Sequence, residues 1–191
     1  MKSGKELTIG CIGWGSLVWD PRALPVSSGW FEDGPWLPVE FARQSANGRI
    51  TLVICGVEHR VRAYWSVLAV SELETAKAAF AAREGIKARY VEQHVGFWEA
   101  ASGRSNGAAA TMIAQWAQVK ALDAVLWANL PIGFIGRRGQ VPAADEILHY
   151  LRRLPPVPSG LAQQYIRKTP PQIDTLYRRR IEQELGWLRE S

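Results

Sequence analysis

Short apolar runs and alternating apolar and polar residues fill the first half of the chain, a pattern typical of β-strands. Residues 7–13 are an almost continuous apolar run, and in residues 37–45 Val39, Phe41 and Arg43 share one face. Asn47-Gly48 is a strong hairpin signal between residues 37–45 and the apolar residues that follow. The predicted strands are therefore residues 7–13, 37–45, 49–55 and 61–70.

The spacing changes to that of a helix after residue 70. Ser71, with Glu74 three positions later, matches the capping-box pattern of a helix N-terminus, and Gly85 is suited to end the helix. Four residues then share one face of this helix, namely Leu73, Ala76, Lys77 and Phe80.

The remainder of the chain is predicted to be mainly helical. A strand over residues 87–100 and a buried strand that ends at Pro131 flank a helix containing Ile113, Trp116 and Ala117. Beyond a glycine-rich loop, the pattern predicts a helix over residues 143–154, a linker over residues 155–160 and a final helix from Pro171. The apolar stripe of the final helix consists of Ile173, Leu176, Tyr177, Ile181, Leu185 and Leu188. Strands first and helices later indicate an α+β fold.

Composition fits one globular domain. The 191 residues are 47% hydrophobic and 21% charged, and no run approaches the roughly 18 apolar residues of a membrane span. The N-terminus has no apolar segment of a secretory signal, and Cys11 and Cys55 lie in apolar surroundings that suit reduced thiols. These features predict a cytoplasmic protein without a membrane partner.

The net charge of +5 favours anionic partners, but the basic residues are scattered except for Arg178–Arg180. The nine tryptophans are spaced at about one per predicted element, which favours core and pocket walls over base stacking. Nucleic-acid binding therefore ranks third among the functional hypotheses, after an enzyme and a small-molecule-binding protein.

Metal and cofactor motifs are missing from the sequence. His59, His94 and His149 are far apart and form no metal-ligand spacing, so we predict no metal. Gly13 and Gly15 match the start of a dinucleotide-binding motif, but Val18 stands where its third glycine belongs. We therefore expect no dinucleotide cofactor.

Three glycines, at positions 10, 13 and 15, cluster at the end of the first predicted strand. Glycine weakens a strand, so something is expected to approach the backbone closely there. Successive N–H groups of such a turn can bind a carboxylate or phosphate, with the Ser16 hydroxyl in support. A tight turn that only lets strands cross explains the glycines equally well.

Glu84 is predicted to lie at the C-terminal end of the helix. The helix dipole disfavours a negative charge there by roughly 0.3–1 kcal/mol when the site is exposed, which suits a general base. An ordinary surface glutamate is the alternative.

The segment CIGWGSLVW resembles the N-terminal motif of the gamma-glutamyl cyclotransferase-like superfamily. Within that superfamily it is most similar to the motif of the glutathione-specific branch. Downstream, AREGIKARYVEQHVGFW is similar to the family segment in which an acidic residue precedes glycine and a tyrosine follows. Glu84-Gly85 and Tyr90 match that order and spacing. The resemblance covers roughly residues 7–130. It departs at Trp14, where the family has tyrosine, and after Pro155, where the small members have no counterpart.

The resemblance implies a small mixed β-barrel with surrounding helices over residues 1–155. The apolar stripe of the final helix predicts that residues 156–191 form a helical extension packed on this barrel. The resemblance further implies that Glu84 is the catalytic base. It also implies that Gly13, Trp14, Gly15, Ser16, Leu17 and Tyr90 bind a small anionic gamma-glutamyl substrate. The implied reaction releases 5-oxoproline and needs no cofactor. A non-catalytic small-molecule-binding protein on the same fold is the alternative. The leaving group and the oligomeric state stay open.

Overall fold

The computed structural model of the protein describes residues 6–190. The chain forms two compact units, each made of segments that are distant in sequence. The first unit contains the described residues through Gly13, then Asp20–Pro35 and Ala63–Asn129. The second contains Trp14–Trp19, Trp36–Arg62 and the described residues from Leu130 onward. Residues 156–190, the predicted extension, thus belong to the second unit.

The first unit is built on a mixed five-stranded sheet with the order β6-β1-β9-β7-β8. Its strands are β1 (Ile9–Gly13), β6 (Tyr64–Val67), β7 (Val95–Glu99), β8 (Ser105–Asn106) and β9 (Ala124–Ala128). β1 is parallel to β9, and the other neighbouring pairs are antiparallel.

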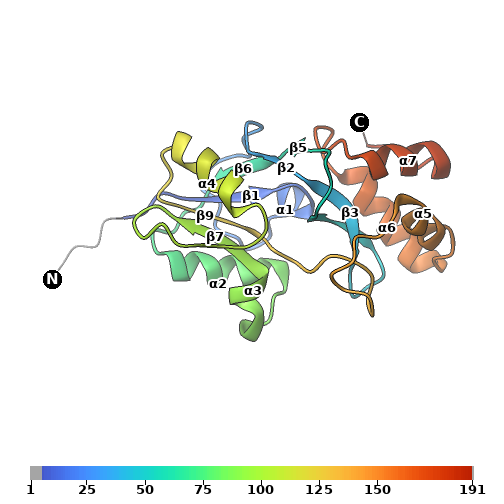
Figure 1. Ribbon diagram of the computed structural model, residues 1–191, viewed down its shortest axis with the longest axis horizontal. Helices are drawn as coiled ribbons and strands as arrows, with labels where there is room; N and C mark the ends of the chain where they lie inside the picture. The colour runs from blue at the N-terminus through green and yellow to red at the C-terminus, as the bar shows by residue number, and fades with distance from the viewer. Residues whose placement is uncertain (1–5, 191) are drawn as a thin grey trace. The chain divides into compact units, whose positions relative to one another are not determined.

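Helices cover both faces of this sheet, with α2 (Leu73–Glu84) and α4 (Ala110–Val119) on opposite sides (Figure 1). All five residues of β1 are buried, as expected for a strand with both faces covered. A 3₁₀ turn, η1 (Ala88–Tyr90), and the short helix α3 (Val91–His94) lead from α2 into β7.

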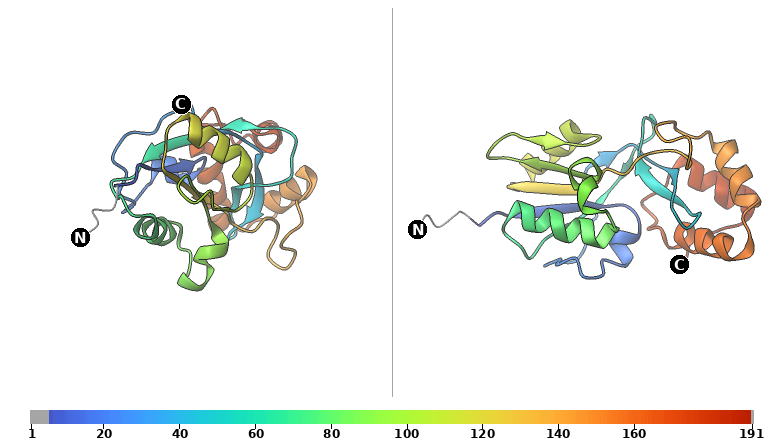
Figure 2. Two further views of the ribbon diagram at one scale, coloured as in Figure 1. Left: turned by 60° about the vertical axis from the view of Figure 1, so that its left-hand side comes forward. Right: turned by 90° about the horizontal axis from the view of Figure 1, so that it is seen from below.

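The second unit contains a β-hairpin with helices packed against it (Figure 2). The hairpin strands β3 (Val39–Gln44) and β4 (Ile50–Ile54) are antiparallel around Asn47-Gly48, as predicted. α6 (Pro156–Lys168) packs on β4, and α7 (Leu176–Leu185) packs on β3. The remaining elements are α1 (Ser16–Trp19), β2 (Trp36–Leu37), β5 (Val61–Arg62) and α5 (Ala144–Arg152).

The α+β class is confirmed, and within residues 6–190 no helix is long and apolar enough to cross a membrane. The strands belong to one five-stranded and two two-stranded sheets, and none of these closes into a barrel over the described residues.

Two predicted helix and strand boundaries were wrong. α2 begins after Glu72, which occupies the N-cap position, so Ser71 does not cap the helix. Residues 88–94 form a 3₁₀ turn and a helix instead of a strand. The rings of Tyr90 and His94 stack with centroids 5.2 Å apart. Side chains four residues apart meet on a helix, and the alternation of apolar and polar residues did not indicate this helical spacing.

The predicted linker over residues 155–160 was also wrong, because α6 begins at Pro156. Proline is compatible with the first turn of a helix, because backbone N–H groups in that turn make no hydrogen bond within the helix. The final helix begins five residues later than predicted, at Leu176, with Thr175 as its N-cap. The Thr175 side chain accepts a hydrogen bond from the Arg178 backbone.

Candidate functional site

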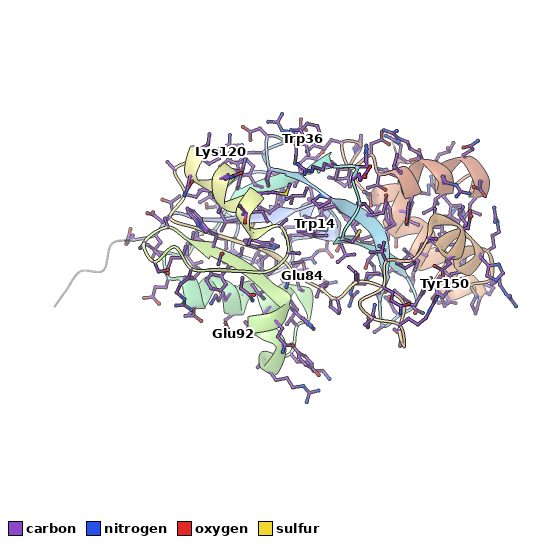
Figure 3. All side chains as sticks on the ribbon, viewed as in Figure 1. Trp14, Trp36, Glu84, Glu92, Lys120 and Tyr150 are labelled. Atoms are coloured by element: carbon purple, nitrogen blue, oxygen red, sulfur yellow. The ribbon has the colours of Figure 1, made fainter. Side chains whose placement is uncertain are left out.

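Glu84 is the last residue of α2, in the first unit (Figure 3). Gly85 ends the helix as predicted, with a left-handed φ of 67°, a conformation that glycine adopts without a Cβ penalty. The Glu84 side chain is 14% exposed. A carboxylate in this position is reachable by a small molecule yet shielded from bulk water.

Arg83 holds one oxygen of this carboxylate. Its Nη1 donates to Glu84 Oε1 at 2.8 Å, while its Nε and Nη2 donate to the Asp20 carbonyl at 3.2 and 2.6 Å. The Arg83 side chain is only 4% exposed, so the guanidinium is fixed. Among residues 6–190, Glu84 Oε2 accepts no hydrogen bond. The carboxylate is therefore oriented through one oxygen, which leaves the other for a ligand.

The sequence pattern alone does not single out Arg83 as a functional residue. The available signal was an arginine in the last turn of a helix, which usually indicates dipole compensation on the surface. In the structure the side chain instead turns inward and becomes the positioning group of the candidate base.

Tyr90 does not bond to Glu84 in the part of the chain that the structure describes. It lies on η1, is 37% exposed and stacks on His94, and the Arg89 guanidinium lies 4.9 Å from its ring centroid. Tyr90 is thus available at the surface of the first unit, but its phenol is not joined to the candidate base.

The predicted binding loop, residues 13–17, divides between the two units. Gly13 ends β1 in the first unit and pairs with Tyr64. Trp14, Gly15, Ser16 and Leu17 belong to the second unit, where Ser16 begins α1. All five residues except Ser16 are buried. Within this loop, Ser16 is therefore the residue that is partly open to solvent.

The close approach that the glycines predicted is made by the protein itself. A Cβ at Gly10 would lie 2.9 Å from Leu122 Cδ1, and a Cβ at Gly15 would overlap the Tyr165 hydroxyl. Tyr165 comes from α6, at the far end of the sequence. These two glycines are therefore required for packing, whether or not a ligand binds nearby.

The chain matches no family model, no curated protein and no solved structure. The assignment of a site consequently depends on the geometry of its own residues and on the motif resemblance.

Nucleophilic and metal chemistry find little support among the described groups. Burial raises the pKa of Cys11 to about 12, and burial likewise raises that of Cys55 to about 12. A thiol with so high a pKa is not a nucleophile near neutral pH. No three His, Cys, Asp or Glu side chains within residues 6–190 gather in a way that could hold a metal ion.

The basic cluster Arg178–Arg180 is already engaged by protein groups. Arg178 is fully buried and donates to the carbonyls of Thr169, Pro170 and Ile173. Arg179 pairs with Asp174, and Arg180 pairs with Asp145 and Glu184. The cluster offers less free positive charge than its sequence suggests.

Proposed function

We propose that the chain is a gamma-glutamyl cyclotransferase-like enzyme that releases 5-oxoproline, with Glu84 as its proton acceptor. The observation that carries the proposal is the carboxylate itself. It is largely shielded from water, fixed by the buried Arg83 through one oxygen, and leaves the second oxygen without a partner among the described residues. A general base needs this combination of orientation and access.

In the proposed reaction Glu84 takes a proton from the α-ammonium of a gamma-glutamyl group. The freed amine attacks the γ-carbonyl of the same molecule and closes a five-membered ring. Glu84 then returns a proton to the leaving amine as the amide bond breaks. The nucleophile and the carbonyl are tethered in one substrate, which supplies a high effective molarity, so the reaction needs no cofactor.

The other parts of the proposal come from the motif resemblance. The backbone of Gly13, Trp14, Gly15, Ser16 and Leu17 is proposed to hold the charged end of the substrate and to stabilise the developing oxyanion. Tyr90 is proposed as a further substrate contact. A cytoplasmic location belongs to this proposal as well.

A non-catalytic binding protein is the second candidate, and one observation favours it. Because the Tyr165 hydroxyl explains the glycine at position 15, that part of the loop motif needs no substrate. If the motif has only this packing role, the chain retains the sequence pattern without the reaction.

The test is a screen of gamma-glutamyl compounds for release of 5-oxoproline, followed by Glu84→Gln in the same assay. Glutamine keeps an oxygen for the Arg83 guanidinium, so the fold should persist. Its amide cannot accept the proton from the substrate, so the reaction should slow. Loss of a general base costs about 10²–10⁴ in rate. We expect kcat to fall by that factor while substrate affinity, measured by calorimetry, changes little.

Glu72→Gln is the matched control, because it changes a glutamate at the opposite end of the same helix. Its turnover should equal that of the wild type. Turnover of Glu84→Gln within about tenfold of wild type would exclude Glu84 as the base. Binding without turnover by the wild type would establish the binding protein instead.

A further inference from the structure

The second unit contains a cavity of about 860 Å³ that neither the motif resemblance nor the proposed reaction uses. Three segments line it: the β3–β4 turn, the glycine-rich loop after β9, and the helix pair α5 and α6. The volume is typical of small-molecule sites, which span about 300–1,000 Å³.

Two aromatic rings form one wall of the cavity. The Phe134 and Tyr150 ring centroids are 5.3 Å apart and the rings are inclined by 55°. Pro158 and Leu154 extend the apolar surface beside them. A flat ring of a ligand can lie against such a wall and replace water there.

Hydrogen bonds hold the Tyr150 side chain in place before any ligand arrives. Its hydroxyl donates to the Gly48 carbonyl at 2.7 Å and accepts from Gln44 Nε2 at 2.9 Å. Gln44 in turn accepts from the backbone N–H of Ile135 at 2.9 Å. A wall fixed in this way requires little ordering on binding, and this preserves affinity.

Charged side chains surround the aromatic wall. Arg137 lies 5.3 Å from the Phe134 ring centroid and pairs with Glu146 at 2.9 Å, so these two charges offset each other. Arg153 bonds to His149 Nε2 at 3.1 Å and, across residues 6–190, pairs with no carboxylate. The lining therefore carries one uncompensated guanidinium.

The helix ends at the cavity do not decide its charge preference. The C-terminal end of α5 and the N-terminal end of α6 both contribute lining residues, and their dipoles oppose each other. The side chains decide it instead, and Arg153 favours an anion. A guanidinium is suited to bind a carboxylate or phosphate through two parallel hydrogen bonds.

We propose that this cavity binds a small aromatic anion, in which a flat ring packs on Phe134 and Tyr150 and a carboxylate or phosphate pairs with Arg153. Nucleoside monophosphates and aromatic carboxylates share this chemistry. Binding requires both halves of the ligand, because the wall supplies no charge and the guanidinium is exposed to water.

The test is calorimetry at low salt with two ligands and their halves. Adenosine 5′-monophosphate is compared with adenosine and inorganic phosphate, and 2-naphthoate is compared with 2-naphthol and acetate. We expect at least one complete ligand to bind ten or more times more tightly than either of its halves. Which of the two succeeds distinguishes a phosphate from a carboxylate ligand. If neither complete ligand exceeds its halves, the proposal is wrong.

Variants then locate the binding. Arg153→Gln and Phe134→Leu should each weaken the successful ligand at least tenfold. Arg152→Gln is the control, since Arg152 is the adjacent residue, pairs with Glu184 at 2.6 Å and does not line the cavity. Wild-type affinity in both cavity variants, with unchanged thermal melting, would show that the ligand binds elsewhere and would overturn the proposal.

Discussion

Tyr165 is the residue whose contacts explain most about the second unit. Its hydroxyl occupies the space that a side chain at position 15 would need, and it accepts a long hydrogen bond of 3.4 Å from the Leu52 N–H. Its ring packs against Trp19 and Phe41, with centroids 5.5 and 6.3 Å away. One side chain of α6 thereby contacts α1, β3 and β4.

Gly15→Ala should therefore destabilise the protein. The new methyl group overlaps the Tyr165 hydroxyl, and overpacking of a core typically costs about 1–3 kcal/mol. Tyr165→Phe removes the hydroxyl, so the double variant should recover part of this loss. Urea unfolding of the wild type, both single variants and the double variant measures the coupling. Strictly additive effects would contradict the contact.

The glycine cluster shows what a sequence can predict at this scale. Three glycines near the end of a strand predict a close approach, and at Gly10 and Gly15 that approach exists. The approaching groups, Leu122 and Tyr165, could not be predicted, because they depend on how distant segments fold together. Arg178 was hidden for the same reason, since only the folded chain gathers the carbonyls that satisfy a buried guanidinium.

Glu40 links two elements of the second unit, β3 and α7. Its carboxylate is 1% exposed and accepts hydrogen bonds from the backbone N–H groups of Phe41 and Tyr177, at 2.8 and 3.2 Å. Burial raises the pKa of Glu40, although these bonds and one from Thr175 act in the opposite direction. The Glu40 carboxyl therefore binds its proton more tightly in the folded protein than in the unfolded chain.

A pH-dependent contribution to stability follows from this raised pKa. The stability linked to the Glu40 proton is fully present below the unfolded pKa and is lost as pH rises through the folded one. Glu40→Gln, which mimics the protonated form, should lack this loss. We expect the stability of Glu40→Gln relative to wild type to increase with pH across that window, measured by chemical unfolding.

The paired comparison is needed because other carboxylates act in the opposite direction. Arg179 lowers the pKa of Asp174, and the Ala143 N–H and Arg137 lower that of Glu146, so both contribute stability that is lost as pH falls. These contributions are common to wild type and variant and cancel in the difference. A difference that stays constant with pH would show that Glu40 does not titrate in this window.

At the scale of elements, hydrophobic periodicity predicted correctly those helices and strands whose formation depends on neighbouring residues in the sequence. The β3–β4 hairpin, α4 and the Gly85 helix end were all predicted correctly. The pattern failed for α3 and α6, where a single helical turn resembles alternation and prolines resemble a linker. Closure of a sheet depends on pairing between distant strands, which no local pattern contains.

The whole chain crosses between its two units after residues 13, 19, 35, 62 and 129. Neither unit is a continuous segment, so each depends on pieces from distant parts of the sequence. Residues 156–190 illustrate this dependence. Their helices α6 and α7 pack on β4 and β3, and residues buried there include Tyr165, Ile166 and Ile181.

Deletion of residues 156–191 should therefore unfold the second unit and not merely remove an appendage. The β3–β4 hairpin would lose both helices that cover it, and an isolated two-stranded hairpin is marginally stable at best in water. We expect a lower melting temperature, binding of a hydrophobic dye, and fast amide exchange in β3 and β4. Exchange in β1, β7 and β9 should change less, because those strands pair within the five-stranded sheet of the first unit. Val157→Ala is the control, since this α6 side chain is 76% exposed and its truncation should leave melting and exchange as in the wild type. A truncated protein that melts at the wild-type temperature would mean that the hairpin is stable without α6 and α7.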